Sequence, residues 1–136
     1  MSLRDQLAGV VVMGPMTKGS NLPYRRLCTE LGARVLVSEM TVARRLKQKR
    51  RSEFALIRRF PGEPCFGVQL AGTNPEEMGW AAALVASRGA DFVSTRDPRS
   101  LGEAMKTHAA AQVRLQDASA TSDASTIVRP ETLLMR

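Results

Sequence analysis

Cysteine and histidine are scarce in this sequence, whose 136 residues include two cysteines and one histidine. Cys28 and Cys65 lack the C-x-x-C spacing of a metal or redox motif, and one histidine cannot complete a zinc site with them. So few cysteines also argue against a disulfide framework, which makes a reducing compartment the default. We therefore expect no metal site, and a cytoplasmic or alternatively a nuclear location.

Long apolar runs are missing as well. No uninterrupted apolar segment reaches the ~18 residues that cross a bilayer. Residues 1–6 lack the apolar stretch of a secretory signal. We therefore expect no membrane partner. The length is sufficient for one domain with a real core, but a closed eight-stranded α/β barrel typically needs ~250 residues.

Acidic residues are outnumbered by basic ones, with 13 Asp and Glu against 20 Lys and Arg, a net charge of +7 and a pI of about 10.4. Such a surplus favours a polyanionic partner, nucleic acid first. Residues 44–51, the basic segment, contain no acid and six basic residues: Arg44, Arg45, Lys47, Lys49, Arg50 and Arg51. Like charges packed this closely repel one another unless an anion offsets them. We interpret the basic segment as an RNA-binding surface that contacts phosphates; the alternative is a solvated loop or helix face.

Strand and helix patterns alternate along the first 93 residues. The run from Gly9 to Met13 is continuously apolar, which predicts a strand buried on both faces, as in parallel sheets. Further strands are predicted at residues 35–37, 65–69 and 91–93, and helices at residues 22–31, 52–60 and 76–87. This alternation predicts an α/β fold with a parallel sheet, either half of a barrel or a small doubly wound sheet.

The apolar spacing within each predicted helix indicates which side faces the core. In the first helix the expected inward residues are Leu22, Leu27, Cys28 and Leu31, and the expected solvent-facing residues are Arg25, Arg26 and Glu30. In the second helix the expected inward residues are Phe54, Ile57 and Phe60. In the third helix they are Met78, Ala81, Ala82, Val85 and Ala86.

Gln69 ends the apolar strand that begins at Cys65, and a turn containing Gly72 follows it. A side-chain amide carries both hydrogen-bond donors and an acceptor. The carboxyl ends of strands are where ligands bind in open α/β sheets and α/β barrels. We therefore interpret Gln69 as a ligand-binding residue.

The character of the sequence changes after Val93. A polar loop, an Ala-rich helix and a disordered stretch are expected at residues 94–100, 101–115 and 117–126 respectively. The last of these is almost entirely Ser, Ala, Thr and Asp, which cannot bury enough apolar surface to offset the entropy of ordering. No pairing partner is evident for residues 127–136. We therefore divide the chain into a barrel-like unit, residues 1–93, and a divergent tail, residues 94–136.

Five motifs resemble, in order and spacing, the start of the tRNA-dihydrouridine synthases. They are Gly14-Pro15-Met16, Asn21 to Cys28, Leu31-Gly32-Ala33, Val37 to Met40 and Val68 to Gly72, and residues 75–78 and 89–93 agree as well. Residues 52–59 are most similar to the eukaryotic branch, which acts near the variable loop of tRNA. The resemblance covers about residues 10–93.

The resemblance implies a TIM (β/α)8 barrel, of which this chain carries about four βα units. It also implies an FMN cofactor, NADPH as the reductant and tRNA as the substrate. In the family, reduced flavin supplies the hydride that saturates the C5–C6 bond of uridine. The flavin contacts of the family carry over to Pro15, Met16 and Thr17 after the first strand, and to Gln69. The last of these agrees with the interpretation of Gln69 from the residues alone.

One segment departs from the family pattern. After the fourth strand the family has Asp-(Ile/Leu)-Asn-x-Gly-Cys-Pro, whose cysteine protonates the uracil, whereas this chain has Ser94 to Pro98 there and no cysteine after Cys65. We therefore assign no catalytic residue. We expect a truncated chain that is inactive alone, because the proton donor and most of the flavin cradle are missing.

Two alternatives to a flavin-dependent reductase remain. The first is a non-catalytic RNA-binding module that uses the basic segment. The second follows from the open edges of a partial barrel, which expose unpaired backbone groups and invite pairing with another copy, or leave the chain without a stable fold.

Overall fold

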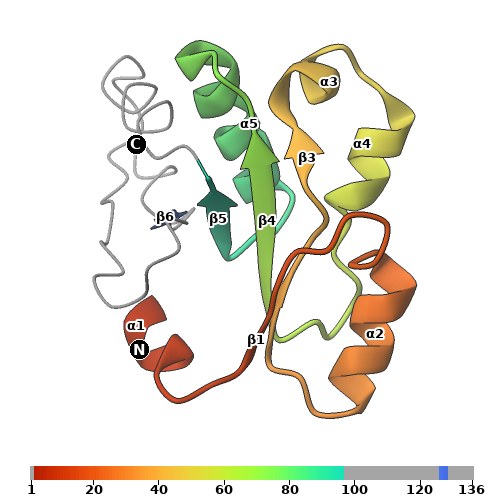
Figure 1. Ribbon diagram of the computed structural model, residues 1–136, viewed down its shortest axis with the longest axis vertical. Coiled ribbons are helices and arrows are strands. Elements are labelled where there is room, and N and C mark those ends of the chain that lie inside the picture. Colours follow the sequence, from red (N-terminus) through yellow and green to blue (C-terminus); the bar gives the residue numbers. More distant parts are fainter. Residues whose placement is uncertain (1, 97–125, 129–136) are drawn as a thin grey trace.

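The computed structural model describes residues 2–96 and 126–128 (Figure 1). Its helices are α1 (Leu3–Leu7), α2 (Leu22–Glu30), α3 (Ala43–Lys47), α4 (Arg51–Leu56) and α5 (Pro75–Ser87). Its strands are β1 (Val12–Met13), β2 (Val35–Val37), β3 (Thr41–Val42), β4 (Cys65–Ala71), β5 (Phe92–Thr95) and β6 (Thr126–Val128). No helix within these residues is both long and apolar enough to cross a membrane.

One six-stranded sheet organises the described residues. The strands lie in the order β1-β2-β4-β5-β6, and β3 also pairs with β4. Strands β1, β2, β4 and β5 run parallel, with Val35 opposite Cys65 and Gly67 opposite Phe92. Figure 1 shows β3, β4 and β5 pointing toward the end of the molecule where α3 lies, and α1 at the other end. This parallel sheet with intervening helices confirms the α/β prediction and fits a partial (β/α)8 barrel.

The larger core lies between the sheet and the helices. Phe66, Val68 and Leu70 of β4 share one face, as the alternation along a strand requires, and pack with buried side chains of α3 and α5. All five inward residues expected in the third helix are buried: Met78, Ala81, Ala82, Val85 and Ala86. Their spacing places them on one side of α5, which confirms the prediction for this helix.

The opposite face of the sheet carries a smaller apolar cluster. Its buried members are Val35, Val37, Cys65 and Phe92, with Leu7 and Val10 packed against them. A Cβ atom on Gly67 would lie 2.2 Å from the Phe92 ring. The ring therefore occupies the space beside Gly67, and any side chain at position 67 would displace it.

Asparagine side chains cap the two longest described helices. The Asn21 side chain accepts the Tyr24 N–H at 3.0 Å, and the Asn74 side chain accepts the N–H groups of Glu76 and Glu77 at 2.9 and 3.1 Å. These bonds satisfy N–H groups that have no partner within the helix, so they fix where α2 and α5 begin.

The orientation predicted for α2 is wrong in part, although Arg26 and Glu30 are exposed as predicted. Leu27 and Leu31 are 50% and 80% exposed, whereas Arg25, expected in solvent, is fully buried. The Arg25 guanidinium lies 4.5 Å from the centroid of the Phe66 ring and forms an ion pair with Glu63. These contacts replace the hydrogen bonds to water that Arg25 gives up on burial. They therefore decide which side of α2 faces the core, in place of the apolar spacing.

The first strand is shorter and more exposed than expected. It contains two residues, and Val11 and Val12 are 88% and 41% exposed, so the predicted burial on both faces is wrong. The cause is its place at the sheet edge, where β2 is its one neighbour among the described strands. Because β1 has an unpaired outer edge among the described strands, pairing of this edge with another copy of the chain stays a prediction.

Strand β5, predicted at residues 91–93, is longer than expected. It includes Ser94 and Thr95, which are buried in the sheet and do not belong to the predicted polar loop. Backbone pairing explains the extension, because Ser94 lies opposite Gln69 and Thr95 lies opposite Leu70 on β4. The rest of the predicted loop lies outside the described residues.

Strand β6 covers the outer edge of β5. It runs antiparallel, with Ile127 opposite Ser94. The predictions of disorder at Thr126 and of no partner for residues 127 and 128 are therefore wrong, because an open strand edge offers free N–H and C=O groups to any extended segment that reaches it. The helix predicted at residues 101–115 and the remainder of the predicted disordered stretch lie outside the described residues.

Candidate functional site

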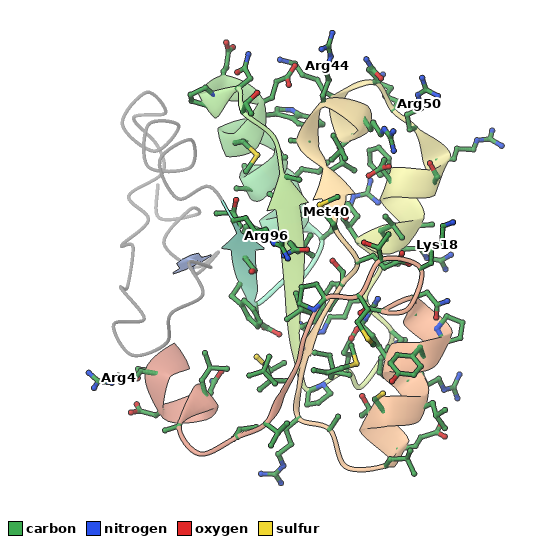
Figure 2. The ribbon with its side chains drawn as sticks, in the orientation of Figure 1. Arg4, Lys18, Met40, Arg44, Arg50 and Arg96 are labelled. Atoms are coloured by element: carbon green, nitrogen blue, oxygen red, sulfur yellow. The ribbon has the colours of Figure 1, made fainter. Side chains whose placement is uncertain are left out.

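The loops that follow the parallel strands meet at one edge of the sheet. Residues 14–20, the β1 loop, follow β1; residues 38–40 follow β2; and residues 72–74 follow β4. Figure 2 shows Arg44 and Arg50 at the end toward which β4 points, Lys18 and Met40 nearer the middle of the view, and Arg4 at the opposite end. In α/β barrels and open α/β sheets, ligands bind at this carboxyl edge.

Hydrogen bonds within the β1 loop fix its shape. The Met16 N–H donates to Ser20 Oγ at 2.7 Å, and Ser20 Oγ donates to the Gly14 carbonyl at 3.2 Å. In return, the Met16 carbonyl accepts the N–H groups of Gly19 and Ser20 at 3.0 and 2.9 Å. The loop is therefore a closed turn whose two ends are joined through Ser20.

A carboxylate joins the β1 loop to the loop after β2. Glu39 Oε1 accepts the backbone N–H of Lys18, a residue that adopts the left-handed conformation at φ 61°. Left-handed backbone is uncommon for residues with a side chain, so the bond helps to hold this turn. Nothing in the sequence indicates that Lys18 lies beside Glu39, so this bond was not predicted.

Gln69 lies on the sheet face that carries the smaller cluster, since it alternates with Phe66, Val68 and Leu70. The residue is largely buried, at 8% exposed, and its backbone N–H donates to Ser38 Oγ at 3.4 Å. The strand continues two residues past Gln69, contrary to the expectation that Gln69 ends it, because β3 and β5 pair with Leu70. Gln69 nonetheless lies within two residues of the carboxyl end of β4.

The structure brings the sequence-predicted cofactor residues to this edge. Pro15 is partly buried, Met16 is 44% exposed and Thr17 is exposed, all in the β1 loop. Strand β2 separates β1 from β4. Because neighbouring strands are ~4.8 Å apart, the β1 loop and Gln69 on β4 are separated across the sheet by about 10 Å. A flat, multi-ring ligand can span such a distance.

The basic segment forms α3, the start of α4 and the turn between them. All six of its basic residues are exposed: Arg44, Arg45, Lys47, Lys49, Arg50 and Arg51. Within the described residues Arg45 alone of the six forms an ion pair, at 3.4 Å from Glu53. Glu53 is buried and also accepts the Val42 N–H at 2.9 Å. Five of the six charges are therefore exposed without an ionic partner in the described residues.

Neither cysteine lies at the carboxyl edge. Cys65 is the first residue of β4, and Cys28 is in α2, where the neighbouring thiol raises the pKa of Tyr24 through a hydrogen bond. No group of three potential metal-ligating side chains occurs among the described residues. The site therefore offers an amide, backbone groups and cations, with no thiol in the described part of the edge.

Comparison with known proteins identifies the family. The family model described as dihydrouridine synthase (Dus) matches residues 11–94, which is more than half of the chain. The chain belongs to the dihydrouridine synthase family. The matched segment includes the β1 loop, the basic segment and Gln69, so the resemblance seen in the sequence motifs is confirmed.

Three relatives of this chain are named tRNA-dihydrouridine(47) synthase [NAD(P)(+)], two of them with the suffix "-like". The relative from Cryptococcus neoformans is 44% identical over 86 residues, covering 60% of this chain and 12% of the relative. The Mus musculus relative is 43% identical over 82 residues, covering 60% and 13%. The Homo sapiens relative is 41% identical over 83 residues, covering 61% and 13%. The chain thus spans about one eighth of the length of these eukaryotic relatives.

Proposed function

We propose that this chain carries part of the FMN site of a tRNA-dihydrouridine synthase, which reduces uridine to dihydrouridine in tRNA with NADPH as the reductant. The observation that carries the proposal is the position of Gln69, a largely buried amide at the carboxyl edge, two strands from the β1 loop. Membership of the family supports the same assignment.

The residues present fit one side of a flavin site. The Gln69 amide can donate to and accept from the polar edge of a heteroaromatic ring. Met16 and Thr17 present exposed side chains from a hydrogen-bonded turn, so they could cover the ring without first becoming ordered. Bound FMN, once reduced by NADPH, would supply the hydride for the C5–C6 bond of uridine, and a separate acid would supply the proton.

We also propose that this chain does not turn over by itself. Reduction of uridine needs a proton donor at the substrate as well as a hydride. Cys65 lies at the amino end of β4, within the smaller apolar cluster, and Cys28 lies in α2. Because neither thiol is at the carboxyl edge, neither can protonate a substrate held there. Dihydrouridine formed in tRNA by the purified chain with FMN and NADPH would contradict this proposal.

Flavin titration of the purified chain tests the FMN assignment. We expect a saturable change in flavin absorbance or fluorescence, weakened by Gln69→Ala. Gln48→Ala is the matched control, since it removes the same amide from an exposed position at the end of α3. A folded chain that leaves the flavin spectrum unchanged, or equal affinities for the Gln69→Ala and Gln48→Ala variants, contradicts the assignment.

RNA binding through the basic segment is the second candidate function. It is supported by five exposed cations with no ionic partner among the described residues, and Figure 2 shows two of them, Arg44 and Arg50, at the end of the molecule toward which β4 points. Contacts with phosphate release counterions, so binding should weaken steeply as the salt concentration rises. Binding of tRNA measured by fluorescence anisotropy over a salt series tests this, and affinity that does not respond to salt contradicts it.

A further inference from the structure

Ser20 has an unusual position for a hydroxyl, because it is fully buried yet belongs to a surface loop. Its Oγ accepts the Met16 N–H at 2.7 Å and donates to the Gly14 carbonyl at 3.2 Å. Its backbone N–H donates to the Met16 carbonyl at 2.9 Å. One residue therefore holds both the N–H and the carbonyl of Met16.

Ser20 is in turn fixed to the body of the protein by Arg25. Arg25 Nη1 donates to the Ser20 carbonyl at 3.0 Å, and Arg25 Nη2 donates to the Arg58 carbonyl at 2.6 Å. The third group, Arg25 Nε, lies 2.8 Å from Glu63 Oε1. The side chains of Arg25 and Glu63 are both fully buried. Hydrogen bonds to charged groups are stronger than neutral ones, so Arg25 holds the Ser20 carbonyl firmly.

The bonds to Ser20 determine which groups of the β1 loop remain available to a ligand. Pro15 has no N–H to offer, and the Met16 N–H and carbonyl are already used. Met16 and Thr17 are exposed, so their side chains remain available to a ligand. Loss of the Ser20 hydroxyl would leave the Met16 N–H and the Gly14 carbonyl without this partner, so the turn could open.

We propose that Ser20 is a positioning residue for the flavin, whose hydroxyl holds the β1 loop in the shape that binds the ring and whose own place is set by Arg25. This inference rests on the proposed FMN function. The competing explanation is that the hydroxyl merely stabilises the fold. The two explanations differ in whether loop opening and flavin affinity change more than global stability does.

Ser20→Ala and Thr29→Val separate these explanations. Thr29 is the matched control, because its Oγ1 donates to the Arg25 carbonyl at 3.0 Å in the neighbouring helix, and valine removes this hydroxyl at nearly constant volume. Amide hydrogen exchange by NMR reports on the loop through Met16 and on the core through Val68. Flavin titration of the same samples reports on the site.

We expect Ser20→Ala to speed amide exchange at Met16 by about tenfold and to weaken FMN binding by about tenfold. Tenfold is the factor that corresponds to the loss of about one hydrogen bond. Thr29→Val should change neither, and exchange at Val68 should match in the two variants. Unchanged exchange at Met16 in Ser20→Ala overturns the inference, as does unchanged FMN affinity. Should Ser20→Ala not fold, Ser20→Cys takes its place with the same expected direction, because a thiol is a weak donor and acceptor.

Failure of the inference and failure of the proposed function give different results. If the unsubstituted chain binds FMN and Ser20→Ala binds it equally well, the function stands and the positioning role is wrong. If the unsubstituted chain binds no FMN, the proposed function is contradicted, and exchange at Met16 alone decides whether Ser20 holds the loop.

Discussion

Arg25 and Glu63 form a fully buried ion pair, in which Nε and Oε1 lie 2.8 Å apart although the residues are 38 positions apart in the chain. The remaining groups of both side chains are also engaged. Arg25 donates to two backbone carbonyls, and Glu63 Oε2 accepts the Phe60 N–H at 3.3 Å. The pair thus joins α2 and the β1 loop to the turn that precedes β4.

Breaking this pair should strongly destabilise the fold. Arg25→Met leaves the Glu63 carboxylate buried without its cation, which typically costs about 3–5 kcal/mol in the free energy of unfolding. Arg26→Met is the matched control, since Arg26 is the adjacent residue and also pairs with an acid, Glu30, but with both side chains more than 60% exposed. Its loss should cost less than about 1 kcal/mol. Chemical denaturation measures both, and similar costs for the two variants would contradict the expectation.

This pair also shows what the sequence could not predict. The inward residues of α5 were predicted correctly because one local spacing places them all on the helix face that packs against the larger core. The orientation of α2 was predicted wrongly because its buried residue depends on a partner far along the chain, and apolar spacing has no means of indicating that Glu63 lies beside Arg25. The exposure of Val11 and Val12 has the same origin, since it depends on which strand lies at the sheet edge.

A side chain at position 67 should disturb the smaller cluster. In Gly67→Ala the new Cβ would lie 2.2 Å from the Phe92 ring, so the ring or the strand must move. Overpacking of this kind typically costs about 1–3 kcal/mol in the free energy of unfolding. Gly14→Ala is the control, because a Cβ there meets nothing within 4 Å and should change stability by less than about 1 kcal/mol.

A double variant tests whether the Phe92 ring is the cause. Phe92→Leu removes the ring atoms that a Cβ at position 67 would meet. We expect Gly67→Ala with Phe92→Leu to lose less stability than the sum of the two single variants, since the residues are in direct contact. Additive losses in thermal or chemical denaturation would contradict this contact as the source of the cost.

The basic segment should contribute to RNA affinity in a way that depends on salt. We expect the triple variant R44Q/K47Q/R50Q to weaken tRNA binding and to make the dependence of affinity on salt shallower, by about one unit of logarithmic slope per lost phosphate contact. The control is R4Q/R26Q/R34Q, which removes the same charge from exposed residues outside the basic segment. Equal effects of the two triple variants in anisotropy titrations would show that net charge alone drives binding.

The parts of the candidate site that a single segment of sequence determines were predictable. An amide near the end of an apolar strand indicated Gln69, and a run of basic residues indicated the surface formed by α3 and α4. Ser20 and Glu39 were not predicted as site residues, because their roles depend on hydrogen bonds between separate parts of the loops. The sequence identifies a side chain that faces a ligand more readily than one that holds the loop around it.

Tyr24 should titrate above its ordinary range because of Cys28. The cysteine hydrogen-bonds with the neutral phenol and disfavours the phenolate, so the pKa of Tyr24 is raised from 10.0. A group whose folded pKa is raised contributes its stabilisation below the unfolded pKa and loses it as pH rises through the folded value.

Tyr24 is the single tyrosine in the chain, so the ultraviolet absorbance of tyrosinate reports on it alone. We expect Cys28→Ala to lower the midpoint toward 10.0 and Cys65→Ala, at the amino end of β4, to leave it unchanged. Equal midpoints in the two variants would contradict the assigned cause.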